Sequence, residues 1–227
     1  MKHLIQGLFA RLGLYISRNP LTYYDLVSEI KESLILQSKG ILHIGAHRGL
    51  EAPFYASLSR NVIWIEAVPS VFDDLQRNIG DFENQSAFLA LLGEEDKDAI
   101  KMYLSSNDYM SSSIFQFGED MNHKSLTMKS EITLPMKRLD SLFEPQHLYD
   151  FKHWIIDVQG SEILVLKGAG SLLHNVNSLE IEISTKREYE SGATWEPVKN
   201  LLNSFGLFPL WEPKENSHED ILFLRRF

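Results

Sequence analysis

The sequence predicts a doubly wound α/β fold with a mostly parallel, seven-stranded sheet. Short apolar runs alternate with segments of helical periodicity along most of the chain. Glycines or acidic residues follow several of these runs, at the strand ends where open α/β sheets bind ligands. The last two runs have only a short connection, so they should pair antiparallel, because a parallel crossover needs about a dozen residues or more.

Helices are predicted ahead of the first strand. Residues 1–15 alternate apolar and polar side chains in the manner of an amphipathic helix, and residues 23–37 repeat apolar residues at helical spacing. We expect residues 1–37 to form a helical extension and residues 38–227 to form one domain. The apolar face of the first helix should pack on the same fold or on a second subunit, with weak peripheral membrane contact as the alternative. A homodimer is therefore a reasonable expectation.

The alternation predicts each element of the domain in order. Ser70 is a candidate N-cap for the second of its helices, and residues 94–150 form a less regular middle. The predicted strands are 41–44, 62–65, 87–92, 154–158, 178–183, 207–211 and 221–225, and the predicted helices are 51–58, 70–79, 161–167 and 195–205.

Composition excludes several classes of function. The net charge is −9 and basic residues are scattered among acids, so we expect no nucleic-acid partner. The absence of cysteine excludes disulfides and thiolate metal sites. The N-terminus lacks the apolar run and the cleavage site of a signal peptide, and no transmembrane segment is expected. We therefore expect a cytoplasmic protein.

A turn with two glycines follows the first predicted strand. Gly45 allows a sharp turn, and Gly49 lets a ligand or the next helix approach closely. The triple-glycine pyrophosphate fingerprint is absent, which counts against NAD or FAD. Glu66 ends the second strand, where a carboxylate can accept both ribose hydroxyls of an adenosine-bearing ligand. The glycine turn and this acid together predict a site for such a ligand.

Acidic side chains follow or lie on two later strands. Asp157 ends the fourth strand, where open α/β sheets place reacting groups. Glu162 lies in the first turn of the next helix, where the macrodipole favours an anion whether or not it has a function. Glu180 and Glu182 share one face of the fifth strand, and buried acids need a partner, a cation or a substrate hydroxyl. Asp157, Glu180 and Glu182 could ligate Mg²⁺, but without a tight ligand motif we predict no metal.

Five segments together resemble the FkbM family of methyltransferases. The resemblance covers roughly residues 40–225, and the block from Asp157 to Ala169 is its most diagnostic part. It implies a Rossmann-like class I methyltransferase fold, S-adenosylmethionine as cofactor, and methylation of a hydroxyl on a sugar, glycan or glycosylated metabolite. The segments are 44–49, 65–70, 111–113, 138–142 and 156–169.

The resemblance also implies where the cofactor binds. The turn would hold its methionine part, Glu66 its ribose, and Asp157 would line the reacting centre. The chain departs from the family at two positions. The family usually has an acid where this chain has His43, and commonly has Asn where this chain has His47. A histidine at His43 can still hydrogen-bond. The implied cofactor-binding residues are His43, Gly45, Ala46, Gly49, Glu66, Ala67 and Asp157.

The segment 105–129 is predicted to be a lid or acceptor-binding loop, because it is rich in polar residues and too irregular for a core element. Its hydroxyls and amides suit a polyhydroxylated acceptor. The predicted acceptor-binding residues are Ser111, Ser112, Ser113, Gln159 and Glu182.

Methyl transfer to an alcohol also needs a base, which adds about two to four powers of ten in rate. Asp157 is the first candidate and His123, in the loop, is the second, whereas His153 is expected to be structural. Two alternatives stay open. The His43 substitution fits a degenerate methyltransferase domain that serves as a binding or scaffold subunit, and a nucleotide-dependent oxidoreductase would share the crevice but lacks its glycine fingerprint.

Overall fold

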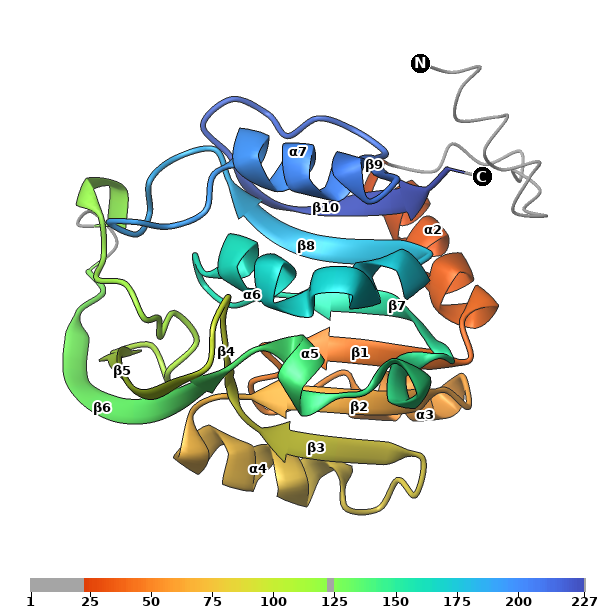
Figure 1. Ribbon diagram of the computed structural model, residues 1–227, viewed down its shortest axis with the longest axis horizontal. Helices are drawn as coiled ribbons and strands as arrows, with labels where there is room; N and C mark the ends of the chain where they lie inside the picture. Colours follow the sequence, from red (N-terminus) through yellow and green to blue (C-terminus); the bar gives the residue numbers. More distant parts are fainter. Residues whose placement is uncertain (1–22, 122–124, 227) are drawn as a thin grey trace. The chain divides into compact units, whose positions relative to one another are not determined.

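A computed structural model describes residues 23–121 and 125–226 (Figure 1). The chain divides after Gln37 into two units. The described part of the first unit is α2 (Tyr23–Gln37), which has the predicted bounds. The helix expected over residues 1–15 lies outside the described residues, so that helix and the dimer argued from it stay predictions.

The second unit contains the predicted seven-stranded sheet. Its strand order is β3-β2-β1-β7-β8-β10-β9, and β10 runs antiparallel to both of its neighbours whereas the other pairs are parallel. The prediction of a mostly parallel sheet that ends in an antiparallel hairpin is confirmed. The strands are β1 (Gly40–Ile44), β2 (Asn61–Glu66), β3 (Gln85–Leu89), β7 (Phe151–Ile156), β8 (Ser178–Ser184), β9 (Leu207–Pro209) and β10 (His218–Arg225).

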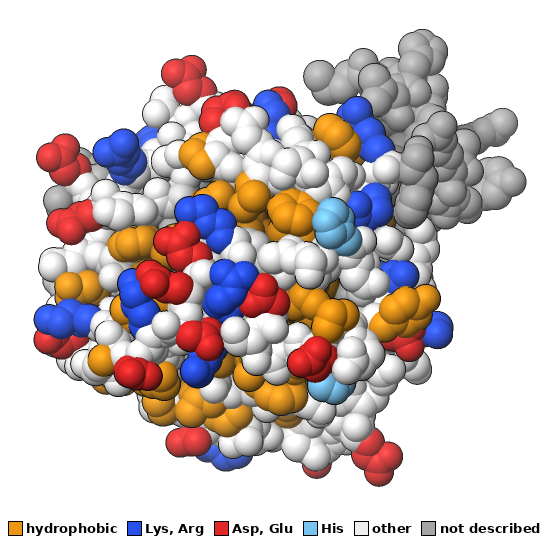
Figure 2. All heavy atoms as spheres, in the orientation of Figure 1, with side chains coloured by type: hydrophobic (Ala, Val, Ile, Leu, Met, Phe, Trp, Pro, Cys, Tyr) orange, Lys and Arg blue, Asp and Glu red, His pale blue; other side chains and the backbone are white. Residues whose placement is uncertain are grey.

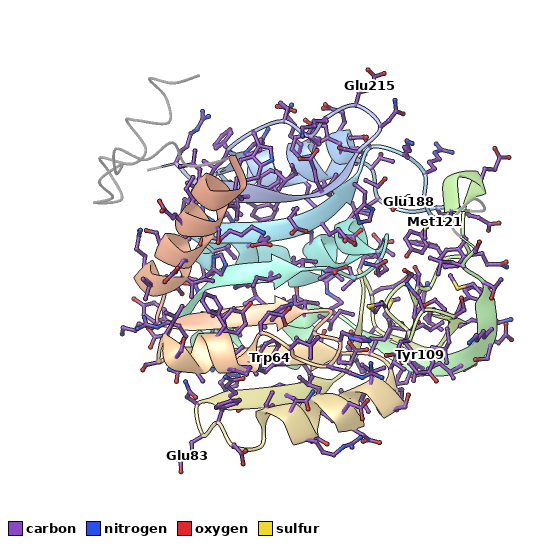
Figure 3. All side chains as sticks on the ribbon, turned by 180° about the vertical axis from the view of Figure 1, so that it is seen from behind. Trp64, Glu83, Tyr109, Met121, Glu188 and Glu215 are labelled. Carbon is purple, nitrogen blue, oxygen red and sulfur yellow. The ribbon has the colours of Figure 1, made fainter. Side chains whose placement is uncertain are left out.

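Helices cover both faces of this sheet, as Figures 1 and 3 show from opposite sides. One face carries α3 (Ala52–Ser57) and α4 (Pro69–Ile79). The other carries α5 (Leu139–Leu142), α6 (Glu162–Ala169) and α7 (Trp195–Ser204). Short 3₁₀ turns connect some of these elements, namely η1 (Glu119–Met121), η2 (Pro145–Leu148) and η3 (Gly170–Asn175).

The main core lies between the sheet and the second group of helices. Alternate residues of each strand point to this face, so Leu42 and Ile44 of β1 lie beside Trp154 and Ile156 of β7 and pack with Val165 of α6. These five side chains are at most 1% exposed. Dense packing of this kind fixes the strand ends at which ligands bind in open α/β sheets.

The middle of the chain is more regular than predicted. β4 (Leu91–Leu92), β5 (Lys97–Ser105) and β6 (Met128–Lys137) form a separate three-stranded sheet. The single strand expected over residues 87–92 is wrong, because β3 ends at Leu89 and Ala90 bonds back to β2 through its backbone N–H. β4 then begins and pairs with β6 in the smaller sheet.

The expectation that Ser70 caps α4 is also wrong. The helix begins one residue earlier, at Pro69, and its N-cap is Val68, whose side chain has no group that could cap it. Proline is well suited to the first helical position because its missing N–H would have no partner there and its φ is already helical.

The surface carries charges of both signs. Figure 2 shows acidic and basic side chains interspersed among small apolar groups on the face it displays. Within the described ranges, no helix combines the length and the apolar character that a bilayer crossing requires.

Candidate functional site

A cavity of about 580 Å³ opens at the carboxyl ends of β1, β2, β7 and β8. This volume falls in the range of small-molecule sites. The smaller sheet and the loop that follows β5 supply its other walls. Figure 3 labels three residues that line the cavity, Tyr109, Met121 and Glu188. They lie on the side of the smaller sheet, away from Trp64 in the core.

The first glycine turn is fastened to β2. The backbone N–H groups of Gly45 and Ala46 both donate to the carbonyl of Ile65, at 2.9 and 3.0 Å. Gly45 has a φ of +84°, and a Cβ there would lie 1.6 Å from the carbonyl oxygen of Asp157. No other residue fits this position, because the turn needs both the left-handed conformation and the close approach of β7.

Glu66 ends β2 beside this turn and is 7% exposed. Its Oε2 accepts the N–H of His47 at 2.9 Å and its Oε1 accepts the N–H of Val68 at 2.8 Å. Burial raises the pKa of this carboxyl, and the backbone N–H groups oppose that rise. The two bonds fix the carboxyl group and leave acceptor capacity on both oxygens toward the cavity.

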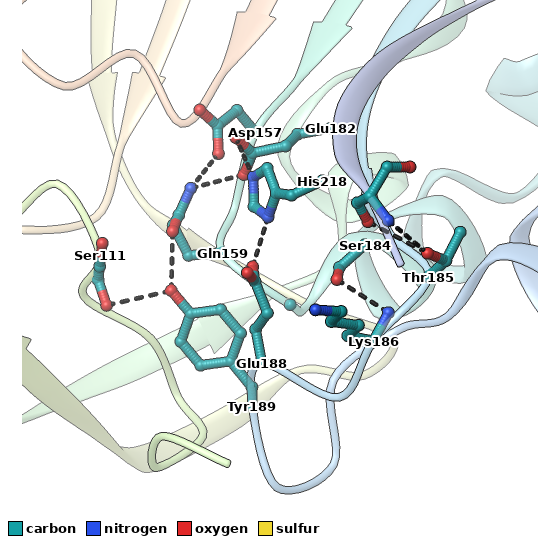
Figure 4. Close-up of polar contacts among 12 residues, drawn as sticks. Ser111, Asp157, Gln159, Glu182, Ser184, Thr185, Lys186, Glu188, Tyr189 and His218 are labelled. Carbon is teal, nitrogen blue, oxygen red and sulfur yellow. Dashed lines mark hydrogen bonds and ion pairs between the residues drawn. The ribbon is translucent and has the colours of Figure 1, made fainter. Parts of the chain in front are cut away.

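Two carboxyl groups meet at one amide in the cavity (Figure 4). Gln159 donates from Nε2 to Oδ1 of Asp157 at 2.6 Å and to Oε2 of Glu182 at 2.7 Å. Tyr189 donates from its hydroxyl to Oε1 of Gln159 at 2.7 Å, which fixes the orientation of the amide. Burial, and then the neighbouring Glu182, hold the pKa of Asp157 well above its usual range.

His218 and Glu188 belong to the same group of side chains and were not predicted from the sequence. The His218 ring lies between Glu182, at 2.6 Å from Nε2, and Glu188, which contacts Nδ1. These two bonds raise the pKa of His218 to about 10, so the ring is an imidazolium at neutral pH. No motif marks either residue.

Glu162 lies behind this group and is 3% exposed. Its Oε1 accepts the N–H groups of Val158 and Gly160 at 3.2 and 3.0 Å. Burial raises its pKa to about 7. Its visible role is to hold the turn between β7 and α6, in which Gln159 and Gly160 both have positive φ.

The three predicted serines all line the cavity, but their hydroxyls also hold the loop in place. The Oγ of Ser111 accepts from Asn107 Nδ2, and that of Ser112 accepts the N–H of Ser105. The hydroxyl of Ser113 donates to the carbonyl of Gln159 at 2.7 Å. The loop is thus joined to the turn that carries Gln159.

A second attachment joins this loop to the glycine turn. Arg48 donates to both oxygens of Asp108, at 2.9 Å for the Nη2 bond, and its Nε donates to Asp74 at 2.8 Å. His47 Nε2 lies 2.9 Å from the carbonyl oxygen of Asp108. Asp108 and Tyr109 both have positive φ, so the loop bends sharply where Arg48 binds it.

Some predicted residues are not brought to the cavity. His43 stacks on Trp64 in the core, and burial lowers its pKa to about 4, so the ring is neutral. A Cβ on Gly49 would meet Leu75 of α4, which makes this glycine a close-packing position. His153 is buried and bonds to Ser178. The remaining predicted cofactor and acceptor residues do line the cavity: Gly45, Ala46, Glu66, Ala67, Asp157, Ser111, Ser112, Ser113, Gln159 and Glu182.

His123, the second candidate base, lies outside the described residues. Within the described part of the chain, no cluster of three or more His, Asp or Glu side chains has the arrangement of a metal site.

Comparison with known proteins decides the family. The sequence model of the methyltransferase FkbM domain matches residues 43–223, most of the chain. The chain belongs to the FkbM methyltransferase family. It is therefore an S-adenosylmethionine-dependent methyltransferase with a Rossmann-like class I fold. Among curated proteins, none matches this FkbM-family sequence significantly.

Solved structures of similar fold include other methyltransferases. Magnesium protoporphyrin IX methyltransferase from Synechocystis PCC 6803, with bound SAH, has 8% identity and a TM-score of 0.47, and the match covers 100% of both chains. Aeropyrum pernix fibrillarin with S-adenosyl-L-methionine has 13% identity and a TM-score of 0.44, over 82% of this chain and 66% of its own. A TehB-like methyltransferase from Corynebacterium glutamicum has 12% identity and a TM-score of 0.44, over 99% and 96%.

Proposed function

We propose that this FkbM-family enzyme is an O-methyltransferase that acts on a hydroxyl of a sugar, glycan or glycosylated small molecule. The observation that carries the proposal is the shared cavity wall in which Asp157, Gln159 and Glu182 are bonded together. These groups suit the hydroxyls of a polyhydroxylated acceptor, because the carboxyl oxygens are strong hydrogen-bond acceptors and the amide of Gln159 holds the two carboxyl groups in place.

The other wall of the same cavity fits the cofactor. Glu66 is buried and fixed, with oxygens that can still accept the two ribose hydroxyls, and Ala67 follows it along the wall. Gly45 and Ala46 line the cavity beside Glu66, where their turn would contact the methionine part of the cofactor. When bound, S-adenosylmethionine supplies a methyl group on a positively charged sulfur, ready for displacement.

The chain's own part in the reaction is to orient the hydroxyl and to accept its proton. The acceptor oxygen would take the methyl group that the cofactor supplies, with the bonding electrons left on sulfur, and Asp157 in its ionised form would accept the hydroxyl proton. The raised pKa of Asp157 makes it a stronger base whenever it is ionised. Holding the acceptor in line can contribute roughly 7–11 kcal/mol to lowering the barrier.

A degenerate methyltransferase domain that serves as a binding or scaffold subunit is the alternative. It is motivated by His43, which occupies the usual position of an acid and is directed into the core, stacked on Trp64. A chain of this kind would bind neither S-adenosylmethionine nor its product.

The proposal predicts micromolar binding of S-adenosylhomocysteine that depends on Glu66. Isothermal titration calorimetry of the wild type and of Glu66→Gln tests it. We expect Kd to rise at least about tenfold in the variant, since the loss of one charged hydrogen bond is worth about 1.5–3 kcal/mol. Glutamine keeps an acceptor for only one of the two backbone N–H groups, so the thermal unfolding of the variant is measured beside its binding to separate loss of the ligand site from loss of the fold.

Glu83→Gln is the matched control, because Glu83 is exposed and lies far from the cavity (Figure 3). It should bind as the wild type does. A wild type that binds neither S-adenosylmethionine nor S-adenosylhomocysteine would refute the enzyme and favour the degenerate domain. If the cofactor binds, the acceptor is then sought by methyl transfer from labelled S-adenosylmethionine to free glycans, glycosides and nucleotide sugars.

A further inference from the structure

His218 lines the cavity, and its imidazole ring contacts two carboxyl groups, those of Glu182 and Glu188. It begins β10, whose antiparallel register places His218 opposite Ser184 and Asp220 opposite Glu182. Glu188 comes from the loop that follows β8. The C-terminal strand therefore brings a cation to the acidic end of the cavity, where the carboxyl groups of Asp157 and Glu182 also lie.

The hydrogen bonds of the ring define its protonation. A neutral imidazole has one donor and one acceptor nitrogen, so one carboxylate would face a lone pair. With carboxyl groups at 2.6 Å from Nε2 and against Nδ1, an imidazolium satisfies both contacts, because each of its nitrogens donates to a carboxylate. Glu188 is 7% exposed, which weakens the competition of water for its bond to the ring.

The same bonds distinguish the two carboxyl groups at Gln159. Glu182 gives one oxygen to the His218 cation and the other to the amide of Gln159. Asp157 accepts a hydrogen bond from the same amide, but no cation lies within bonding distance of it among the described residues. When two acids share a site they cannot easily both ionise, so the one without the cation keeps the proton.

We propose that His218 is a positioning residue, which as an imidazolium holds Glu182 as the carboxylate of the pair and so leaves the single proton of the pair on Asp157. The cation also offsets the charge of Glu182, which lets Asp157 release that proton more readily than it could beside a bare carboxylate. Asp157 acts as the base for the acceptor hydroxyl only after this release. This inference rests on the proposed function only where it concerns catalysis, since the arrangement of charges follows from the side chains of this protein without any ligand.

Other titratable groups line the pockets around the His218 ring. Asp157, Glu162, Lys186 and Tyr189 line the two adjoining pockets that His218 also lines. Glu219 and Asp220 follow it on its own strand. Lys186 is a second cation nearby, but among the described residues it contributes a backbone bond to Ser184 rather than an ion pair with Glu182 or Glu188.

The first measurement is ¹⁵N NMR of the histidine rings of the full chain as a function of pH. We expect one ring with both nitrogens protonated beyond pH 8, and its signal should vanish in His218→Gln. Glu188→Gln retains His218 and removes one partner, so its ring should titrate at least about one pH unit lower. His147→Gln, which changes an exposed histidine outside the cavity, should leave that ring unchanged.

The second measurement follows Asp157 by ¹³C NMR of labelled aspartate carboxyl groups, assigned with Asp157→Asn. In His218→Gln the carboxyl of Asp157 should titrate at higher pH than in the wild type, and in His218→Lys it should move back toward the wild type. A purely structural histidine would show neither the shift nor the rescue.

The results separate this inference from the proposed function. A His218 ring that titrates near pH 6.5, or an Asp157 titration that is the same in His218→Gln and the wild type, overturns the inference even if S-adenosylhomocysteine binds. Loss of S-adenosylhomocysteine binding in the wild type overturns the proposed function even if both titrations come out as expected.

Discussion

Glu162 is a buried acid whose carboxyl titrates within the physiological range. Its pKa is about 7 in the folded chain and 4.5 when exposed. Between these values the folded protein holds a proton that the unfolded chain has lost, so its contribution to stability is full below pH 4.5 and is lost as pH rises through 7. The wild type should therefore lose about 2 to 3 kcal/mol of unfolding free energy through this group between pH 5 and pH 8.

Glu162→Gln isolates this effect, because glutamine keeps an oxygen for the N–H groups of Val158 and Gly160 but has no proton to lose. Urea unfolding at pH 5 and pH 8 should show the variant gaining about 2 to 3 kcal/mol relative to the wild type. Glu83→Gln should show no such gain. A difference between Glu162→Gln and the wild type that is the same at both pH values would contradict the account.

At the scale of single residues, the strand ends were predictable. Asp157 and Glu66 each terminate an apolar run, and in a parallel sheet all such ends meet at one edge, so their shared cavity follows from local sequence. His43 could not be placed in this way. It is one residue before the strand's end, and the period of two directs it away from the cavity, against Trp64.

Among the elements, the loop after β5 is held by the glycine turn through Arg48. The guanidinium group binds both carboxyl oxygens of Asp108, a geometry that fixes orientation as well as distance. We predict that Asp108→Ala speeds hydrogen exchange severalfold in the amides of residues 105–113, because the sharply bent segment loses this attachment.

Hydrogen-exchange mass spectrometry measures this directly on the full chain. Asp98→Ala, which removes an exposed acid from β5 outside the cavity, is the control and should leave the loop's exchange unchanged. Equal exchange in Asp108→Ala and the wild type would mean that the serine hydrogen bonds alone hold the loop.

The elements that could be predicted were those with a strong local period. β1, β2, α4 and β8 followed from apolar runs and helical spacing. β5 and β6 were missed although Ile100, Met102 and Leu104 alternate, as do Ile132 and Leu134, because polar residues separate them and the strands carry one buried face only. The alternation of apolar and polar residues typical of a strand was present in the sequence, but the polar residues of the surrounding loop obscured it.

At the scale of the molecule, charge opposes one class of acceptor. With 31 acidic and 22 basic residues the chain should repel a phosphate backbone. We predict that a single-stranded RNA of 30 nucleotides shows no binding tighter than about 100 μM at 150 mM salt. Fluorescence anisotropy at 150 mM salt measures this, and micromolar binding there that weakens steeply at higher salt would contradict the prediction.

The acidic end of the site also belongs to this scale. His218 meets Glu182 only because β10 returns antiparallel beside β8, and Glu188 meets the ring only because its loop folds back over both. Neither contact leaves a mark in local sequence, since the residues are separated by long stretches of chain. A predicted hairpin gives the pairing of strands but not the register that decides which side chains face each other.

Gly45 has a further meaning for how such enzymes can diversify. The missing side chain lets the end of β7 touch the end of β1, where the N–H of Asp157 donates to the carbonyl of Ile44 at 3.0 Å. The supports of the two halves of the cavity are therefore neighbouring strands about 4.8 Å apart, with no loop between them. The described part of residues 93–137 supplies side chains on the other side of the cavity, among them Met102, Tyr109 and Ser113. We therefore expect that substitutions in this wall change which acceptor is bound, while the frame formed by the ends of β1 and β7 stays the same.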